Sequence, residues 1–171
     1  MLVRDAEPSD APAVIALVSA SFQGYREFGA PGWEPPVPGP EQELATERML
    51  GDDRIWWVVA EDENGHAGHC SFTPAHTRRQ MQGDAIAGMA HFLQLFIRPD
   101  LWGSGLAGDL HDRALTAMRE RDYTRARLLT PEGQARARAF YELRGWRPGP
   151  VSIEDPVDLN GLPVVEYRLE L

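Results

Sequence analysis

The sequence has only one cysteine, Cys70, so the chain cannot form an intramolecular disulfide bond. It has no lysine, and all 17 of its Lys and Arg positions are arginine. It also lacks an apolar run long enough to cross a bilayer, and it shows no charged and then apolar leader. We therefore expect a cytoplasmic protein that does not act on membranes.

Positive charge is scarce in this chain. Its 26 acidic and 17 basic residues give a formal net charge of −9. A protein without a broad positive surface is poorly suited to bind nucleic acid or anionic lipid. We expect no nucleic-acid partner, and the acidic surface instead suits a cationic or amine-bearing substrate.

The length and the hydrophobic pattern predict one mixed α/β domain over residues 1–171. Short apolar or alternating runs between turn residues predict strands at 2–6, 54–61, 66–73, 89–98, 125–129 and 162–171. Helical spacing predicts a helix that starts near 8–10 and fades by Gly24, and further helices at 41–50, 105–121 and 133–144. Residues 74–87 either extend the hairpin or loop out. Strand 89–98 is apolar almost throughout, so we expect it to be buried on both faces.

Residues 29–40, GAPGWEPPVPGP, are rich in proline and glycine. Proline fixes φ and removes donor N–H groups, so this segment predicts a long, stiffened loop. Trp33 in its middle either pins the loop to the body of the protein or forms an aromatic wall of a binding site. The sequence leaves both interpretations open.

Residues 93–110, LQLFIRPDLWGSGLAGDL, predict a buried strand, a turn, a glycine-rich loop and the start of a helix. Such a loop aims unpaired N–H groups at the space above the helix start, which favours anions and above all phosphates. Gly103, Gly105 and Gly108 carry no Cβ, so a ligand can approach the main chain closely there. The segment is therefore the strongest candidate binding site in the sequence.

Two general phosphate-binding motifs fit this segment poorly. A P-loop needs Lys and then Ser or Thr after its last glycine, whereas Leu106 and Ala107 follow Gly105 here. The dinucleotide spacing GxGxxG is present at Gly103, Gly105 and Gly108. That motif belongs near the start of an alternating βαβ unit, however, and here it follows antiparallel-looking strands past the middle of the chain. We regard this match as a coincidence.

A more specific pattern extends beyond the loop. The strand, RPDLWGSGLAGDL, the helix, the strand RARLLTP and the segment GQARARAFYELRGW together resemble the GNAT superfamily of acyl-CoA-dependent N-acetyltransferases. The family's Q/R-x-x-G-x-G/A loop falls on Trp102, Gly105 and Ala107, and its N-x-x-A-x-x-FYE-x-x-GF ending falls on ARARAFYELRGW. The chain departs from the pattern at Trp102, where Gln or Arg is common, and at Gln134, near where Asn is usual.

The resemblance covers the chain from end to end and implies both a fold and a co-substrate. The implied fold is a twisted, mostly antiparallel sheet of about six or seven strands with flanking helices, splayed between the strands at 89–98 and 125–130. The implied co-substrate is acetyl-CoA. The residues expected to contact it are Leu95, Phe96 and Ile97 for the pantetheine arm, Trp102, Gly103, Ser104, Gly105, Leu106, Ala107 and Gly108 for the pyrophosphate, and Gln134 and Arg138 beside them. The simpler interpretation places Arg136, Arg138 and Arg144 on the solvated side of their helix, and the alternative is that they contact the adenosine 3′-phosphate of the coenzyme.

The implied reaction is the attack of a neutral amine on a thioester carbonyl. Tyr141 matches the family's general acid, which protonates the departing thiolate. Helical spacing places Ala135, Ala139 and Leu143 on one shared face of the helix. Tyr141 lies nearly opposite, with small Ala137 one turn before it, so we do not expect a core tyrosine. The competing interpretation is that Tyr141 only packs against the preceding helix or the coenzyme.

The base and the acceptor site are less sharply defined by the sequence. His91 and Gln94 start the buried strand, near where the family often places a glutamate or a group that holds water. His91 otherwise serves as a hydrogen-bonded structural histidine. Tyr25, Glu27 and Trp33 lie in segments that overlie the acceptor site in this family, where a carboxylate and aromatic faces suit an amine.

Two further features predict no chemistry of their own. His66 and His69 are three residues apart on a strand, so we expect them on opposite faces. A metal site there would lack further ligands, and we expect no metal. Cys70 has no evident base partner and is expected to be a buried thiol.

We therefore predict an N-acetyltransferase that moves an acetyl group from acetyl-CoA to the primary amine of a small molecule. The loop at 29–40, if it folds across the site, favours a small acceptor over a peptide or protein, which would need an open groove. Two different functions compete with this prediction, namely a non-catalytic module that binds acyl-CoA and a dinucleotide-binding oxidoreductase. The sequence leaves a homodimer open.

Overall fold

The computed structural model describes residues 1–29, 31–78, 81–152 and 161–171. Its strands are β1 (Leu2–Asp5), β2 (Trp56–Asp62), β3 (Gly65–His76), β4 (Ala85–Ile97), β5 (Arg125–Pro131), β6 (Arg147–Ser152) and β7 (Val164–Glu170). Its α-helices are α1 (Ala11–Gln23), α2 (Pro40–Leu50), α3 (Leu106–Glu120) and α4 (Ala135–Leu143). Short 3-10 helices cover Pro8–Asp10, Gly24–Glu27 and Pro99–Leu101.

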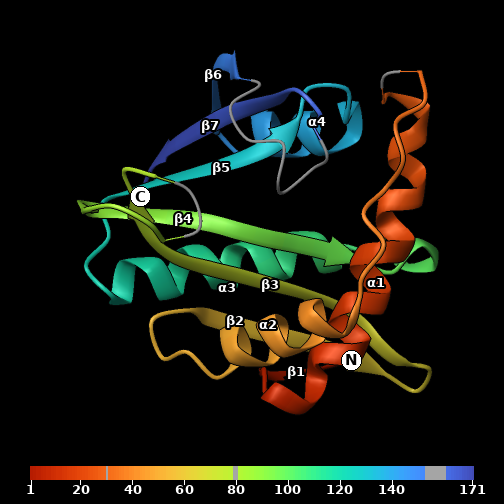
Figure 1. Cartoon of the computed structure of the whole chain (residues 1–171). Coiled ribbons are helices and arrows are strands. Elements are labelled where there is room, and N and C mark those ends of the chain that lie inside the picture. The colour runs from red at the N-terminus through yellow and green to blue at the C-terminus, as the bar shows by residue number, and fades with distance from the viewer. Residues whose placement is uncertain (30, 79–80, 153–160) are drawn as a thin grey trace.

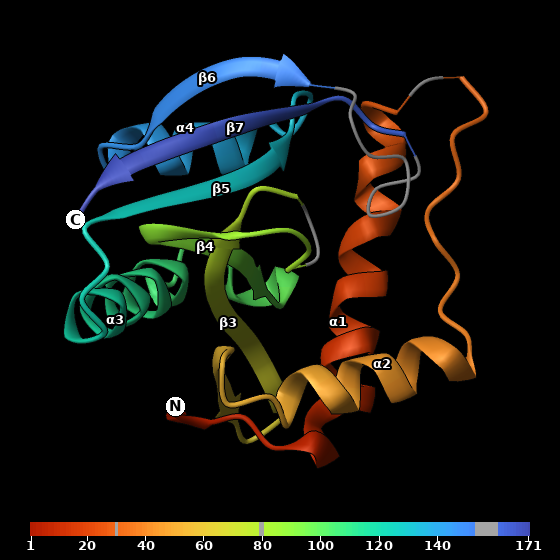
Figure 2. The ribbon, with the colours of Figure 1, turned by 60° about the vertical axis from the view of Figure 1, so that its left-hand side comes forward.

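The strands form one seven-stranded sheet in the order β1-β2-β3-β4-β5-β7-β6 (Figure 1). Every neighbouring pair is antiparallel except β4 and β5, which are parallel. Helices α1 and α2 lie on one side of the sheet and α3 lies on the other (Figure 2). The prediction of a mixed α/β fold around a mostly antiparallel sheet is confirmed.

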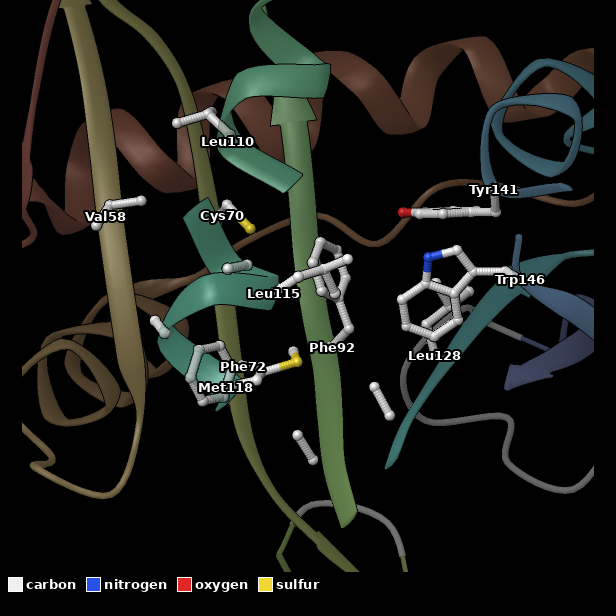
Figure 3. Packing of buried hydrophobic residues seen from close by; sticks show 14 of the residues in the cluster. Val58, Cys70, Phe72, Phe92, Leu110, Leu115, Met118, Leu128, Tyr141 and Trp146 are labelled. Carbon is white, nitrogen blue, oxygen red and sulfur yellow. The ribbon is translucent and has the colours of Figure 1, made fainter. Parts of the chain in front are cut away.

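Buried side chains hold helices to both faces of the sheet. On one face, α3 and α4 pack on the strands through residues that include Leu110, Met118 and Leu128, each at most 1% exposed (Figure 3). On the other face, α1 and α2 pack on β2 through a smaller cluster that includes Val14 and Leu50. Burying one such side chain contributes about 1.5–3 kcal/mol, so these two layers fix the helices against the sheet.

Strands β4 and β5 separate part of the way along their length. Their pairing runs from Met89 with Arg125 to Phe92 with Leu128 and ends there. Beyond it, β4 stays paired with β3 up to Ile97. The predicted splay is confirmed. Because β5 no longer lies beside them, residues 93–96 are only half-buried, and the prediction that this strand is buried throughout on both faces is wrong in its second half.

The structure decides one segment that the sequence left open and adds one strand that the sequence did not predict. The hairpin extends to His76 on one side and restarts at Ala85 on the other, so both ends of the segment 74–87 lengthen the strands. Strand β6 was not predicted, because RPGPVS carries two prolines and a glycine and has the composition of a turn. It forms the outer edge of the sheet, where a missing N–H leaves no ladder partner unpaired.

Helix α4 presents a different face to the core from the one predicted. Leu143 is 88% exposed, whereas Tyr141 is only 8% exposed and belongs to the buried cluster. The prediction that Tyr141 is not a core residue is therefore wrong. The helix has only nine residues, and the adjacent rings of Phe140 and Tyr141, which both pack inward, outweigh the alanine stripe in setting its orientation.

The two leucines at these helices give a direct test of the core assignment. We expect Leu110→Ala to lower the free energy of unfolding by about 2.5–4 kcal/mol, because it leaves a cavity under α3. Leu143→Ala, the matched control, should change it by less than about 0.5 kcal/mol. Urea unfolding measures both, and equal losses for the two variants would contradict this arrangement.

Candidate functional site

The glycine-rich loop before α3 presents a row of main-chain N–H groups. Gly103 and Gly105 have φ values of +83° and +94°, which favour glycine, and Gly105 is the N-cap of α3. Within the described chain, the amides of Gly103, Gly105, Ala107 and Gly108 donate to no backbone carbonyl. The Ser104 hydroxyl accepts from the Leu106 N–H at 3.3 Å. Four free amides at the positive end of a helix form a cradle for an anion.

Arg98 anchors the strand end that leads into this loop. Its guanidinium donates to Asp62 at 2.6 Å and to Asp100 at 2.7 Å. It also donates to the carbonyl of His66 at 3.3 Å. These contacts tie the segment before the loop to the turn between β2 and β3, which fixes where the free amides lie.

Trp102 lies at the start of the loop and is 51% exposed. Its indole N–H donates to the carbonyl of Ile97, at the end of β4, at 3.0 Å. The guanidinium carbon of Arg136, from α4, lies 3.3 Å from the centre of its ring. This cation–π contact bridges the loop and α4, so Arg136 does more than face solvent.

The last glycine of the motif has a second role in packing. A Cβ at Gly108 would collide with the Arg144 guanidinium, so the missing side chain leaves room for that guanidinium against α3. Arg144 pairs with Asp112 at 2.6 Å and lies over the Phe140 ring. The Arg144 side chain is 30% exposed and that of Asp112 is 65% exposed, so Arg144 lies at the surface but is held there by these contacts.

Gln134 and Arg138 lie at the start of α4 and both bond to protein groups. Gln134 is the N-cap residue, and its side chain lies near enough to the phenol of Tyr25 to lower the pKa of that phenol, against the larger effect of burial. Arg138 donates to the hydroxyl of Tyr167 at 3.1 Å and to the carbonyl of Glu132 at 3.0 Å. Both residues therefore lie near the splay, with Arg138 turned toward β7.

Leu95, Phe96 and Ile97 form the unpaired stretch of β4. On one side they pair with Cys70, His69 and Gly68 of β3. On the other side, within the described residues, no strand pairs with them. The stretch therefore offers a free strand edge directly before the amide cradle, which an extended ligand with amide groups can pair with.

Tyr141 points from α4 into the splay. Its ring packs against Phe92, Trp146 and Tyr167, with ring centres about 6 Å apart. Figure 3 shows the ring reaching toward β4 with the hydroxyl oxygen as its leading atom. Burial raises the pKa of the Tyr141 phenol well above its ordinary value. The group therefore stays protonated at neutral pH and is able to donate a proton or a hydrogen bond.

Gln94 belongs to a row of hydrogen bonds that the sequence pattern did not predict. The His69 Nε2 atom lies 3.0 Å from the Gln94 Oε1 atom, and the His66 Nε2 atom lies 3.0 Å from the His69 Nδ1 atom. The expectation that the two histidines lie on opposite faces is wrong. Strand β3 bulges where Ala60 pairs with Gly68 and Glu61 pairs with His66, which breaks the alternation of faces.

His91 lies three residues before Gln94 on β4 and is half-buried. It pairs with Thr73 of β3. Its place on the part of β4 that is still paired with β5 sets it farther back than Gln94 along the strand. A register shift between His91 and Gln94 places both on the face of β4 that lies across from Thr73 and Ser71 of β3.

The three residues predicted to face the acceptor differ in burial and in position. Tyr25 is 9% exposed and packs between Phe22 and Phe28, with ring centres 5.0 Å away on both sides. Glu27 is exposed. Trp33 folds back over Gly29, so it lies close to the start of its own loop.

Aromatic residues in the last turn of α1 and directly after it link the two sides of the splay. The ring of Phe22 lies 6.1 Å from that of Phe96 on β4. Phe28 lies directly against Gly133, at the turn that leads into α4. The chain after α1 therefore crosses from one separated strand to the other, with Tyr25 buried between these contacts.

Membrane spans and metal clusters are both absent from the described residues. No helix in the described ranges is long and apolar enough to span a membrane. No group of three or more His, Cys, Asp or Glu residues in those ranges is placed to hold a metal ion. Cys70 is fully buried and its pKa is raised by burial, so the prediction of a buried thiol is confirmed.

Comparisons with known proteins agree with this geometry. The sequence profile of the acetyltransferase (GNAT) family matches residues 22–146. No match was found among curated protein sequences.

Three solved structures illustrate the similarity of the fold. A ribosomal-protein-alanine N-acetyltransferase from Brucella melitensis has a TM-score of 0.75 at 17% identity, covering 100% of both chains. A variant of the spermidine N-acetyltransferase from Vibrio cholerae has a TM-score of 0.67 at 19% identity, covering 99% of this chain and 95% of that one. The PaiA N-acetyltransferase from Thermoplasma acidophilum, in complex with coenzyme A, has a TM-score of 0.65 at 14% identity, covering 98% of both chains.

His69, the buried histidine in the row of hydrogen bonds from His66 to Gln94, makes a prediction about how stability depends on pH. Burial lowers the pKa of His69 to about 3, whereas an unfolded histidine titrates near pH ~6.5. As the pH falls below that value, protons bind the unfolded chain first, and stability is lost. We expect His69 to make the free energy of unfolding about 2 kcal/mol lower at pH ~5 than at pH ~8. Urea unfolding at both pH values measures it.

His69→Gln removes the titrating group and should lose that part of the pH dependence. Burial also lowers the pKa values of His66 and His111, so the difference between variant and wild type is the quantity to compare. His76→Gln, at the surface hairpin, is the control. An unchanged pH dependence in His69→Gln would show that His69 is not held neutral.

Proposed function

Because the chain belongs to the acetyltransferase (GNAT) family, we propose that it transfers an acetyl group from acetyl-CoA to the primary amine of a small molecule by direct attack on the thioester. The observation that carries the proposal is the juxtaposition of a free amide cradle, an unpaired strand edge and the Tyr141 phenol around one splay. Acetyl-CoA supplies an activated acetyl thioester when it is bound.

The residues around the splay fit acetyl-CoA in two places. The free amides between Trp102 and Gly108 suit the negatively charged pyrophosphate. The free edge of β4 at Leu95, Phe96 and Ile97 suits the amide groups of the pantetheine arm, as an added strand would. Gln134, and Arg138 less directly because it is bonded to Tyr167, lie beside this path.

Tyr141 is proposed as the general acid. Its raised pKa keeps the phenol protonated at neutral pH, so it can donate a hydrogen bond to the departing thiolate sulfur and then protonate it. The step balances because the amine nitrogen bonds to the acyl carbon and releases one proton, the carbon–sulfur bond breaks, and the sulfur takes the Tyr141 proton. The proton released by the amine then restores the phenol. A free thiol has a pKa of about 8.5, so this assistance is useful but need not be large.

On the acceptor side, His91 and Gln94 are proposed as the polar groups near the amine. His91 has a side chain that can take a proton near neutral pH. Gln94 cannot act as a base, so its proposed role is to hold the acceptor or a water molecule. These two residues lie on the strand that also borders the splay.

The acceptor is proposed to be a small amine. Tyr25, Glu27 and Trp33 supply aromatic faces and a carboxylate in the chain between α1 and α2. The net charge of −9 also suits a cationic acceptor. The structural neighbours act on different amines by their names, a ribosomal-protein alanine and spermidine. A peptide or protein acceptor is therefore the alternative. The proposal includes a cytoplasmic location and is compatible with a homodimer.

A binding and turnover experiment tests the proposal. Acetyl-CoA should raise the melting temperature of the protein and NADH should not, because a ligand bound only by the folded state stabilises it. Free thiol should then appear when acetyl-CoA is mixed with one class from a panel of polyamines, amino acids, amino sugars and short peptides. Acetyl-CoA binding without thiol release over the whole panel would favour a non-catalytic module, and NADH binding alone would favour an oxidoreductase.

Two glycines serve as matched variants for the binding measurement. Gly105→Ala places a methyl group in the cradle at a φ of +94°, and it should reduce the melting shift given by acetyl-CoA. Gly24→Ala is the control, because Gly24 has a helical φ of −68° and open space where a Cβ would lie. It should leave the shift unchanged.

The phenol of Tyr141 gives a separate prediction. Tyr141→Phe should lower kcat about tenfold or more, because the thiolate loses its proton donor, while the affinity for acetyl-CoA stays within about twofold. Tyr123→Phe, a half-buried tyrosine that packs on Phe72, is the control. Steady-state kinetics and a binding titration make the comparison, and wild-type turnover in Tyr141→Phe would remove Tyr141 from the mechanism.

A further inference from the structure

We infer that His66 and His69 are positioning residues that hold the Gln94 carboxamide in one orientation, with its oxygen toward β3 and its NH2 group offered to an oxygen atom in the acceptor site. This inference rests on the proposed function, because the acceptor site belongs to it. It adds two residues from β3 that touch neither substrate.

The geometry of the row fixes its direction. A carboxamide oxygen only accepts, so the 3.0 Å contact with Gln94 Oε1 requires that His69 Nε2 carry the hydrogen. A neutral imidazole has one N–H, so His69 Nδ1 is an acceptor. The 3.0 Å contact with His66 therefore requires that His66 Nε2 carry a hydrogen too. All donors in the row point from His66 toward Gln94.

The same direction determines what Gln94 can offer. With its oxygen bonded to His69, the NH2 group is turned the other way. In the described part of the chain, no acceptor bonds to that NH2 group, and Gln94 is only half-buried. Gln94 is therefore a hydrogen-bond donor to its surroundings, which suits an oxygen of the acceptor or of a water molecule beside the amine.

The surroundings of the two histidines keep the row intact over a wide pH range. His69 is fully buried between Trp57 and Phe96 and stays neutral. His66 faces the charged groups Asp10, Glu61, Arg4 and Arg98. If His66 gains a proton, its Nε2 atom still carries a hydrogen, so the direction of the row does not change.

The contrast with Ser71 singles out the histidines. Ser71 is the residue of β3 that lies directly across from Gln94. Its hydroxyl is fully buried and has no hydrogen-bond partner among the residues that the structure describes. Gln94 thus bonds to a histidine two residues away along β3 in place of its nearest polar neighbour, which makes His69 the residue to test and Ser71 the matched control.

Kinetics of five variants, with acetyl-CoA and the best acceptor from the amine panel, provide the test. We expect Gln94→Leu and His69→Phe each to lower kcat about tenfold, the loss of one buried hydrogen bond. The double variant should fall no further, because both changes remove the same contact. His69→Gln, which can still donate to Gln94, should recover most of the activity. Ser71→Ala should match the wild type.

The pH profile separates positioning from base catalysis. A positioning role predicts that His69→Phe lowers kcat by the same factor at every pH from about 6 to 9. Loss of one limb of the profile would instead identify His69 as a base, and wild-type kcat in His69→Phe, or additive losses in the double variant, would also overturn the inference. Melting temperature and acetyl-CoA affinity confirm that each variant is folded.

A spectroscopic measurement on the wild type tests the row without any turnover. Nitrogen-15 NMR distinguishes the two tautomers of a neutral histidine, and we expect His69 to carry its hydrogen on Nε2. A hydrogen on Nδ1 overturns the inference even if the enzyme is active. Absence of turnover over the whole panel would instead count against the proposed function and leave this NMR result to decide the row.

Discussion

The separation of β4 from β5 is the constraint on which the rest of this structure depends. Two parallel strands that stop pairing after Phe92 and Leu128 leave a strand edge within the sheet. Unpaired backbone N–H and C=O groups are costly unless water or a ligand hydrogen-bonds to them, so such an edge needs one of these two partners. The loop at 102–108 lies directly beyond that edge. Its free amides at the start of α3 also need a hydrogen-bond acceptor.

The splay needs support from behind, because the strands no longer hold each other. Side chains from both halves meet in one buried cluster, in which Phe92 of β4 packs against Tyr141 and Trp146. The Trp146 indole N–H donates to His111 of α3 at 3.0 Å, fully buried. Breaking such a bond leaves a buried donor unpaired at a cost of about 1–3 kcal/mol. The buried cluster under α3 thus fixes how far β4 and β5 separate. Phe22, Tyr25 and Phe28 bridge the two strands from the other face of the sheet.

The order of the elements and the glycine loop could be predicted from the sequence because both depend on local chemistry. Alternation, helical spacing and glycine at positive φ each act within a few residues. The errors arose where partners are far apart in the chain. The prolines of β6 obey a rule that depends on the edge position, which only the sheet reveals. The orientation of α4 depends on what Phe140 and Tyr141 meet, and the His66–His69 contact depends on a bulge; the glycines at 65 and 68 are the only local signal for it.

The two faces of the sheet differ in a way that agrees with the proposed chemistry. The face under α3 and α4 is filled by apolar side chains and aromatic rings. On the opposite face, Trp57 and Ser71 lie directly across from each other, and Thr73 follows on the same side of β3. All three carry buried polar atoms without a hydrogen-bond partner in the described ranges of the chain. Each such atom costs about 1–3 kcal/mol if it stays unsatisfied. A fold that gathers these groups beside the His69–Gln94 contact gives up stability on the face from which Gln94 is proposed to reach the acceptor, whereas the face under α3 and α4 gains stability from packed apolar side chains.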